Sequence, residues 1–211
     1  YFMTIPEKPT DHPAFQAFLS DLACLGVTPV APNTSDAKDA LHYSLLGARS
    51  NPRWWVLPRQ SLRMTKAGLA MFQPVTRGAK LFKRALVTLS NIGLTGLWAK
   101  QGLILSGHPA ALKALMPTLA SCAYFTGTQG PHRKTALQLI GPKGDILGYA
   151  KVSQNPLVQP FLKTEAAALQ GLATTPLISA DVPTLSLIHI SEPTRPLYIS
   201  YAVFCLKKIF F

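Results

Sequence analysis

The stretch from 121 to 183 restricts the fold more than any other part of the sequence. Three β-prone segments lie at 123–125, 135–140 and 146–152, and glycine-containing turns separate them at 126–130 and 141–145. A helical pattern follows at 160–171. Strands joined by such short turns pair antiparallel. The sequence therefore predicts an α+β lobe, in which a small antiparallel sheet is covered by one packed helix.

Two charged residues in this stretch stand where apolar residues are expected. Lys151 lies near the end of the third strand, between Ala150 and Val152. On a helical wheel of about 100° per residue with Leu162 at 0°, Glu165 falls near 300°, inside the apolar arc. A carboxylate on the inward face of a helix is costly unless a cation meets it. We therefore expect Lys151 and Glu165 to form an ion pair.

This arrangement resembles a known family. A glycine-containing turn between two strands, a strand ending in Ala-Lys and a helix with an inward Glu are similar to the N-terminal lobe of the protein-kinase-like fold. The nearest type is the aminoglycoside-phosphotransferase kind of small-molecule kinase. The resemblance covers about 60 of the 211 residues.

The resemblance implies an ATP-dependent phosphotransferase acting on a small molecule or a sugar hydroxyl. Lys151 would contact the nucleotide phosphates, and Glu165 would hold that lysine. The turn from Gly127 to Gly130 would cover the phosphates, with Thr126 and Thr128 adding hydroxyl or backbone donors. Glycines suit this task because backbone N–H groups reach phosphate oxygens without an intervening Cβ.

The sequence also departs from the family pattern. The turn has only Gly127 and Gly130, and Pro131 follows at once. There is no His-Gly-Asp-x-x-x-x-Asn catalytic loop, and Asp181 fits no metal-binding role. We therefore expect a fragment without transferase activity, and Mg²⁺ only in a complete parent protein. The alternative reading of Lys151 and Glu165 is a structural ion pair, or two separate exposed side chains, on a small α+β domain.

Residues 1–118 predict a mixed α/β region of unassigned role, preceding the kinase-like lobe at 119–184. An amphipathic helix is expected around Phe15 to Leu25, closed by Gly26. The remaining expected elements are strands at 27–31, 41–46 and 54–57 and helices at 78–89 and 109–116. Trp54 and Trp55 are adjacent on a strand, so they should face opposite sides of the sheet.

Charge is distributed unevenly along the chain. Between Asp39 and Asp145 there are 14 Lys or Arg and no acidic residue. This favours an alternative function, a non-enzymatic basic module that docks on an anionic surface of lipid, polysaccharide or nucleic acid. The expected helix at 78–89 carries Lys80, Lys83 and Arg84 and suits either a membrane surface or a plain solvated face.

Several other residue patterns exclude common classes of site. His132, Arg133 and Lys134 are next to the proposed phosphate turn, where we expect a basic strand edge facing water, with phosphate contact as the alternative role. The histidines lack metal-ligand spacing, which excludes a zinc site. The sequence has three scattered cysteines and no secretory signal, which indicates a cytoplasmic protein. It has no apolar run long enough to cross a membrane, so we expect no transmembrane segment.

Residues 185–211 resemble the translation of a transposase-type sequencing adapter. One matching block covers 185–195, a second covers 199–207, and a three-residue spacer at 196–198 fits the position of a variable index. We expect this segment to be an artefact rather than a domain, the alternative being a genuine C-terminal strand or a short membrane anchor.

Overall fold

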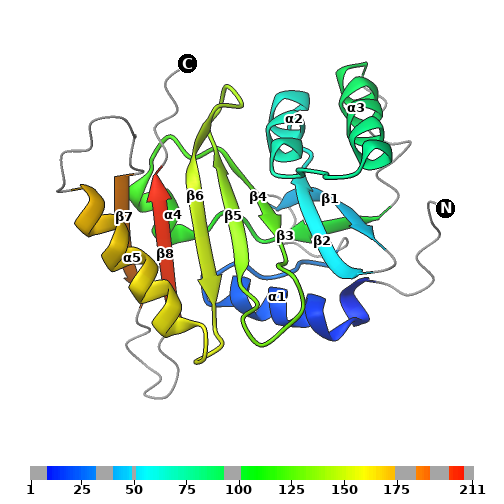
Figure 1. Ribbon diagram of the computed structural model, residues 1–211. Coiled ribbons are helices and arrows are strands. Elements are labelled where there is room, and N and C mark those ends of the chain that lie inside the picture. The colour runs from blue at the N-terminus through cyan, green and yellow to red at the C-terminus, as the bar shows by residue number, and fades with distance from the viewer. Residues whose placement is uncertain are drawn as a thin grey trace.

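The computed structural model describes residues 9–31, 40–48, 51–92, 101–173, 184–190 and 200–206. Within these residues one antiparallel sheet of eight strands runs in the order β3-β1-β2-β4-β5-β6-β8-β7 (Figure 1). The strands are β1 (Leu41–Ala48), β2 (Asn51–Pro58), β3 (Gly102–Leu105), β4 (Ser121–Phe125), β5 (Thr135–Ile140), β6 (Ile146–Ser153), β7 (Thr184–Ile190) and β8 (Ser200–Leu206). The helices are α1 (Pro13–Ala23), α2 (Leu62–Ala70), α3 (Arg77–Asn91), α4 (Ala110–Leu115) and α5 (Gln159–Ala173), with a 3-10 turn at Pro9–Asp11. The predicted α+β class with an antiparallel sheet is confirmed.

Strands from the two predicted regions of the sequence lie side by side in this sheet. β2, from within 1–118, pairs with β4, from within 119–184, through Trp55 opposite Phe125 and Val56 opposite Tyr124. The two regions therefore share one sheet.

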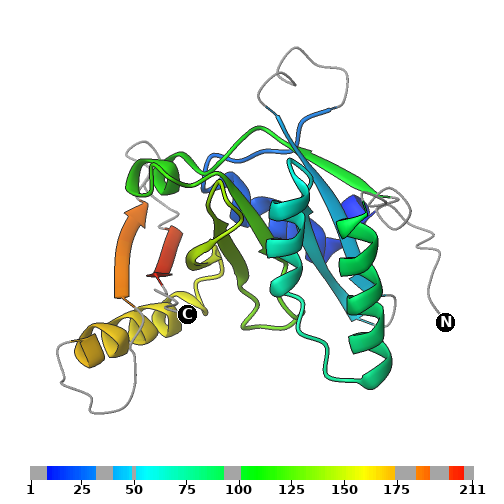
Figure 2. The ribbon, with the colours of Figure 1, turned by 90° about the horizontal axis from the view of Figure 1, so that it is seen from above.

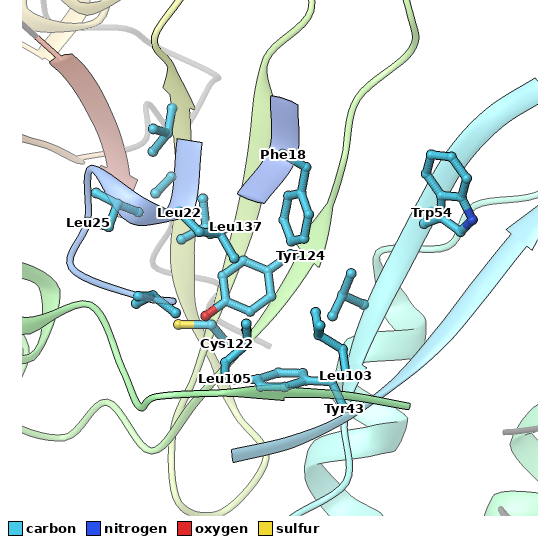
Figure 3. Packing of buried hydrophobic residues seen from close by; sticks show 14 of the residues in the cluster. Phe18, Leu22, Leu25, Tyr43, Trp54, Leu103, Leu105, Cys122, Tyr124 and Leu137 are labelled. Atoms are coloured by element: carbon cyan, nitrogen blue, oxygen red, sulfur yellow. The ribbon is translucent and has the colours of Figure 1, made fainter. Parts of the chain in front are cut away.

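One face of the sheet carries the larger apolar core, covered by α1 and α4. Phe18 and Leu22 of α1 pack over the middle strands, where Tyr124 and Leu137 are fully buried (Figure 3). The ring centroids of Phe18 and Tyr124 are 6.0 Å apart in an edge-on arrangement. Leu112 of α4 closes the same core. Aromatic side chains bury large areas, so this face contributes most of the hydrophobic stabilisation.

Local sequence explains why α1 forms where it does. The His12 side chain caps the helix, its Nδ1 accepting from the Ala14 N–H at 3.1 Å, and Pro13 occupies the first helical position. Phe15, Phe18 and Leu22 recur at helical spacing and face the sheet. The predicted helix is confirmed.

The opposite face carries a smaller core beneath α2 and α3. Leu69 of α2 and Leu86 of α3 are buried against Leu57 and Ala123 of the sheet. Trp54 belongs to the core under α1, whereas Trp55 packs on this second core. The two tryptophans thus face opposite sides, as predicted.

Helix α5 lies on the same side of the sheet as α2 and α3, whereas α4 is on the other side (Figure 2). Ala150 and Val152 of β6 point into the core under α1. Lys151, between them, therefore points toward α5, because side chains alternate along a strand.

Three parts of the fold differ from the sequence expectation or extend it. The strand expected at 27–31 is wrong, since only an isolated bridge joins Pro29 to Leu105. Proline has no N–H to donate to a ladder, which explains this loss. Helix α2 and strand β3 were not predicted. The sequence signals of both elements were short. For α2 the signal is the capping residue Ser61, whose side chain accepts from the Met64 N–H. For β3 it is only the largely apolar four-residue segment 102–105.

Strands β7 and β8 fall within 184–211 and extend the sheet beyond β6. An open strand edge pairs with any extended segment that reaches it. The pairing therefore leaves the expectation about the origin of 185–211 untested. Across the described residues, no helix combines the length and apolar character required to cross a bilayer.

Candidate functional site

The predicted pair of charged residues is present at the contact between β6 and α5. Lys151 Nζ donates to Glu165 Oε1. The neighbouring α5 residues Leu162 and Ala166 are buried, which fixes the helix and aims Glu165 at the strand. Both charged side chains are about one-third exposed, at 34% and 32%. The predicted ion pair is therefore confirmed, and it is reachable from solvent.

A second lysine shares the same carboxylate. Lys134 Nζ lies 3.8 Å from Glu165 Oε2, and the Lys134 side chain is 40% exposed. Two ammonium groups thus surround one carboxylate and leave one positive charge in excess. Each ammonium has three donors, so hydrogen-bonding capacity remains for an anion.

A pocket of about 290 Å³ opens beside these lysines. Its floor crosses three strands, since Phe125 is the register partner of Ala136 and Ala136 is the partner of Lys151. The residues lining the pocket are Phe125, Gly127, Thr128, His132, Arg133, Lys134, Ala136 and Lys151. The pocket therefore combines apolar side chains from β4 and β5 with cationic side chains.

The turn between β4 and β5 forms one side of the pocket, and its shape requires a glycine. Gly127 has φ of +80°, and a Cβ there would lie 2.3 Å from the Lys134 carbonyl oxygen. Any other residue would clash with this backbone. Gly127 thus lets the two ends of the turn approach each other closely.

The structure separates the predicted turn residues into two groups. Gly127 and Thr128 line the pocket, together with Lys151. Thr126 is buried, and its hydroxyl accepts from the Trp54 N–H at 2.9 Å, tying the turn to β2. Thr126 and Gly130 are not among the residues that line the pocket.

The Arg133 side chain points inward and hydrogen-bonds to the turn, whereas the sequence predicted that it would face water. Its guanidinium donates to Asp21 Oδ2 at 2.6 Å, to the Ala17 carbonyl at 2.9 Å and to the Thr126 carbonyl at 2.9 Å. The Arg133 side chain is only 12% exposed. The expectation for this residue was wrong because a buried carboxylate on α1 draws the guanidinium inward.

That carboxylate, Asp21, was missed by the sequence analysis. It also accepts from Thr135 Oγ1 at 2.7 Å and from the Gln154 N–H at 2.9 Å. Asp21 thereby connects α1 to the start of β5 and to the residue that follows β6. Its sequence signal was its position three residues after Phe18, on the apolar face of α1.

His132 links the turn to α5 at the rim of the pocket. Its ring meets the Phe161 ring edge-on, with centroids 5.1 Å apart. Within the described part of the chain, no group of three or more His, Cys, Asp or Glu side chains is arranged to hold a metal ion.

Comparison with known proteins adds no relative. No protein-family model, no curated protein and no solved structure matches this chain. The functional argument therefore depends on the geometry of the site.

Proposed function

We propose that residues 119–184 form the nucleotide-binding lobe of an ATP-dependent phosphotransferase of the kinase-like fold. The parent enzyme would act on a small molecule or a sugar hydroxyl. The observation that carries the proposal is the Lys151–Glu165 pair at a pocket that Gly127 and Thr128 of the glycine-containing turn also line. A strand lysine held by a helix glutamate beside a glycine-containing turn is the phosphate-binding arrangement of kinase-like enzymes.

The residues present fit the polyphosphate part of ATP. The pocket volume, about 290 Å³, is at the lower end of the range of roughly 300–1,000 Å³ for small-ligand sites, which suits phosphate groups better than a whole nucleotide. Gly127 and Thr128 of the turn line the pocket, and the missing Cβ of Gly127 lets the turn close against the Lys134 carbonyl. The excess positive charge of Lys134 and Lys151 over Glu165 attracts an anion.

Each residue has a distinct task in this proposal. Lys151 contacts phosphate oxygens, and Glu165 holds the lysine in place. Phosphoryl transfer depends mainly on positioning and charge neutralisation. ATP supplies the phosphoryl group, and Mg²⁺ would act in the complete parent. The sequence has no catalytic Asp-containing loop of the kinase type, so we expect nucleotide binding without transfer. Use of ATP also makes the cytoplasm the proposed compartment.

ATP binding to the full chain, measured by isothermal titration calorimetry, tests this proposal. Lys151→Ala should weaken ATP binding by about 10- to 100-fold, because a charge-assisted contact is lost. Lys163→Ala is the matched control, since Lys163 is exposed on α5 and outside the pocket lining. Equal ATP affinity of the Lys151→Ala variant and the unchanged protein would overturn the proposal and leave the pair as a structural contact.

A further inference from the structure

A second surface of the molecule, remote in sequence from the pocket, is strongly basic. It is formed by α2, α3, the segment between them and the residues just before α2, and we call it the α2–α3 surface. Its exposed cations are Arg59, Arg63, Lys66, Arg77, Lys80 and Arg84. None of these six forms a salt bridge with any other described residue. Its charge is therefore not neutralised within the described part of the chain.

The helices that carry this surface are fixed to the sheet by their inner faces. Leu69 of α2 and Leu86 of α3 are buried in the second core, and Gln138 of β5 donates through Nε2 to the Ala67 carbonyl at 2.8 Å. The outer faces point away from the sheet (Figure 2). The cations are thus held in place on a rigid support.

Exposed aliphatic side chains stand among the cations. Val75 is 88% exposed and Leu81 is 68% exposed. With Leu81 at 0° and about 100° per residue, Arg77 falls near 320° and Arg84 near 300°, so both lie within about 60° of the leucine on the outer face of α3. The large apolar side chains exposed on α2, α3 and their flanks are Leu62, Val75, Leu81 and Ile92. None of the four is aromatic.

Cations interspersed with aliphatic rather than aromatic side chains favour one kind of anionic partner over another. Proteins that bind single-stranded nucleic acid use exposed aromatic side chains to stack on bases. Aliphatic side chains between cations instead suit the headgroup and acyl boundary of a bilayer, where the cations meet anionic headgroups and the aliphatic groups leave water.

We propose that the α2–α3 surface binds the surface of an anionic lipid bilayer. Arg77, Lys80 and Arg84 contact the headgroups, and Val75 and Leu81 enter the interface. This binding is independent of the nucleotide pocket, because no residue of the α2–α3 surface lines that pocket.

Co-sedimentation of the full chain with vesicles tests the charge requirement. Vesicles of phosphatidylcholine with about 30% phosphatidylserine should bind the protein, neutral phosphatidylcholine vesicles should not, and raising salt should reverse the binding. Arg84→Glu should weaken binding by about tenfold or more. The matched control is Lys163→Glu on α5, which should bind as the unchanged protein does. Equal losses in both variants would show a delocalised attraction and overturn the proposal.

A second pair of variants tests the apolar requirement. Leu81→Ser should weaken vesicle binding by several-fold, since about 0.8 kcal/mol per buried CH₂ is lost. Leu157→Ser is the control, because Leu157 is 61% exposed and away from the α2–α3 surface. Circular dichroism checks that all variants are folded. If Leu81→Ser leaves vesicle binding unchanged, or if Arg84→Glu weakens binding to duplex RNA but not to vesicles, the bilayer proposal is wrong.

Discussion

On each face of the sheet a helix carboxylate of the described residues pairs with cations, and the two sites, Asp21 under α1 and Glu165 under α5, differ in exposure and in partners. Under α1, the Asp21 and Arg133 side chains are 2% and 12% exposed. Under α5, the Glu165 and Lys151 side chains are 32% and 34% exposed. The first pair is sealed in protein, whereas the second is open to solvent and borders a pocket.

The difference shows which pair is available for binding. Asp21 accepts from a guanidinium, a hydroxyl and a backbone N–H, so little of its capacity is left for a ligand. The two lysines near Glu165 have donors to spare and an excess of charge. The pair under α1 therefore stabilises the fold, and the pair under α5 is the one suited to a ligand.

The sharpest test of this contrast is Asp21→Ala. Removing the carboxylate leaves the buried Arg133 guanidinium without its partner, so the free energy of unfolding should fall by about 3–5 kcal/mol. Urea unfolding followed by circular dichroism measures this. Asp11→Ala, at an exposed position, should change stability by less than about 0.5 kcal/mol. A loss below about 1 kcal/mol for Asp21→Ala would show that the buried pair is not a structural anchor.

Gly127→Ala tests whether the backbone conformation of the turn beside the pocket requires a glycine. The positive φ and the close Lys134 carbonyl should make this change cost roughly 1–3 kcal/mol. Gly171→Ala is the control, since α5 is helical there and a Cβ would meet no atom within 4 Å. That variant should gain up to about 1 kcal/mol. Equal stability of the two variants by thermal denaturation would contradict the assignment of Gly127.

The core under α1 also predicts a loss of stability at alkaline pH. Burial raises the pKa of the Cys122 thiol from 9.0 to about 12, and burial raises the pKa of Tyr124 well above its ordinary value. Above pH 9 the unfolded chain therefore loses these protons first, so unfolding becomes more favourable as pH rises. The thiol alone should contribute a loss on the order of 1 kcal/mol by pH 10.

Thermal melts between pH 7 and pH 10.5 measure this dependence. In Cys122→Ala the alkaline decline should become shallower, although the variant is less stable at pH 7 because a buried group is lost. A decline of the same steepness in both proteins would mean that the buried thiol does not cause it.

The smallest expected effect belongs to the open ion pair. Glu165→Gln keeps the size of the side chain and removes its charge, and the free energy of unfolding should change by less than about 1 kcal/mol, because ion pairs open to solvent are weak. The same urea experiment compares it directly with Asp21→Asn. A cost for Glu165→Gln as large as that for Asp21→Asn would erase the distinction between the two faces.

The sequence analysis found one of these acidic residues and not the other, although the same reasoning applies to both. Glu165 was identified because it falls inside the apolar arc of its helix. Asp21 falls near 300° when Phe18 is set at 0°, about 60° from Phe18 and beside the buried Ala14 near 320°. The partner of Glu165 was fourteen residues away in the chain, within one local motif. The partner of Asp21 is 112 residues away, and no local pattern identifies it.

The sequence by itself determined the hairpins from β4 to β6, the helix α5 and the Lys151–Glu165 pair. These features depend on turn chemistry and on apolar periodicity, which act over a few residues. Only the tertiary structure decided that β2 pairs with β4, that Arg133 turns inward to Asp21 and that Lys134 joins Lys151 at one pocket. Those contacts depend on which distant segments become neighbours, and this is decided by how the two apolar faces of the sheet are covered rather than by any local signal.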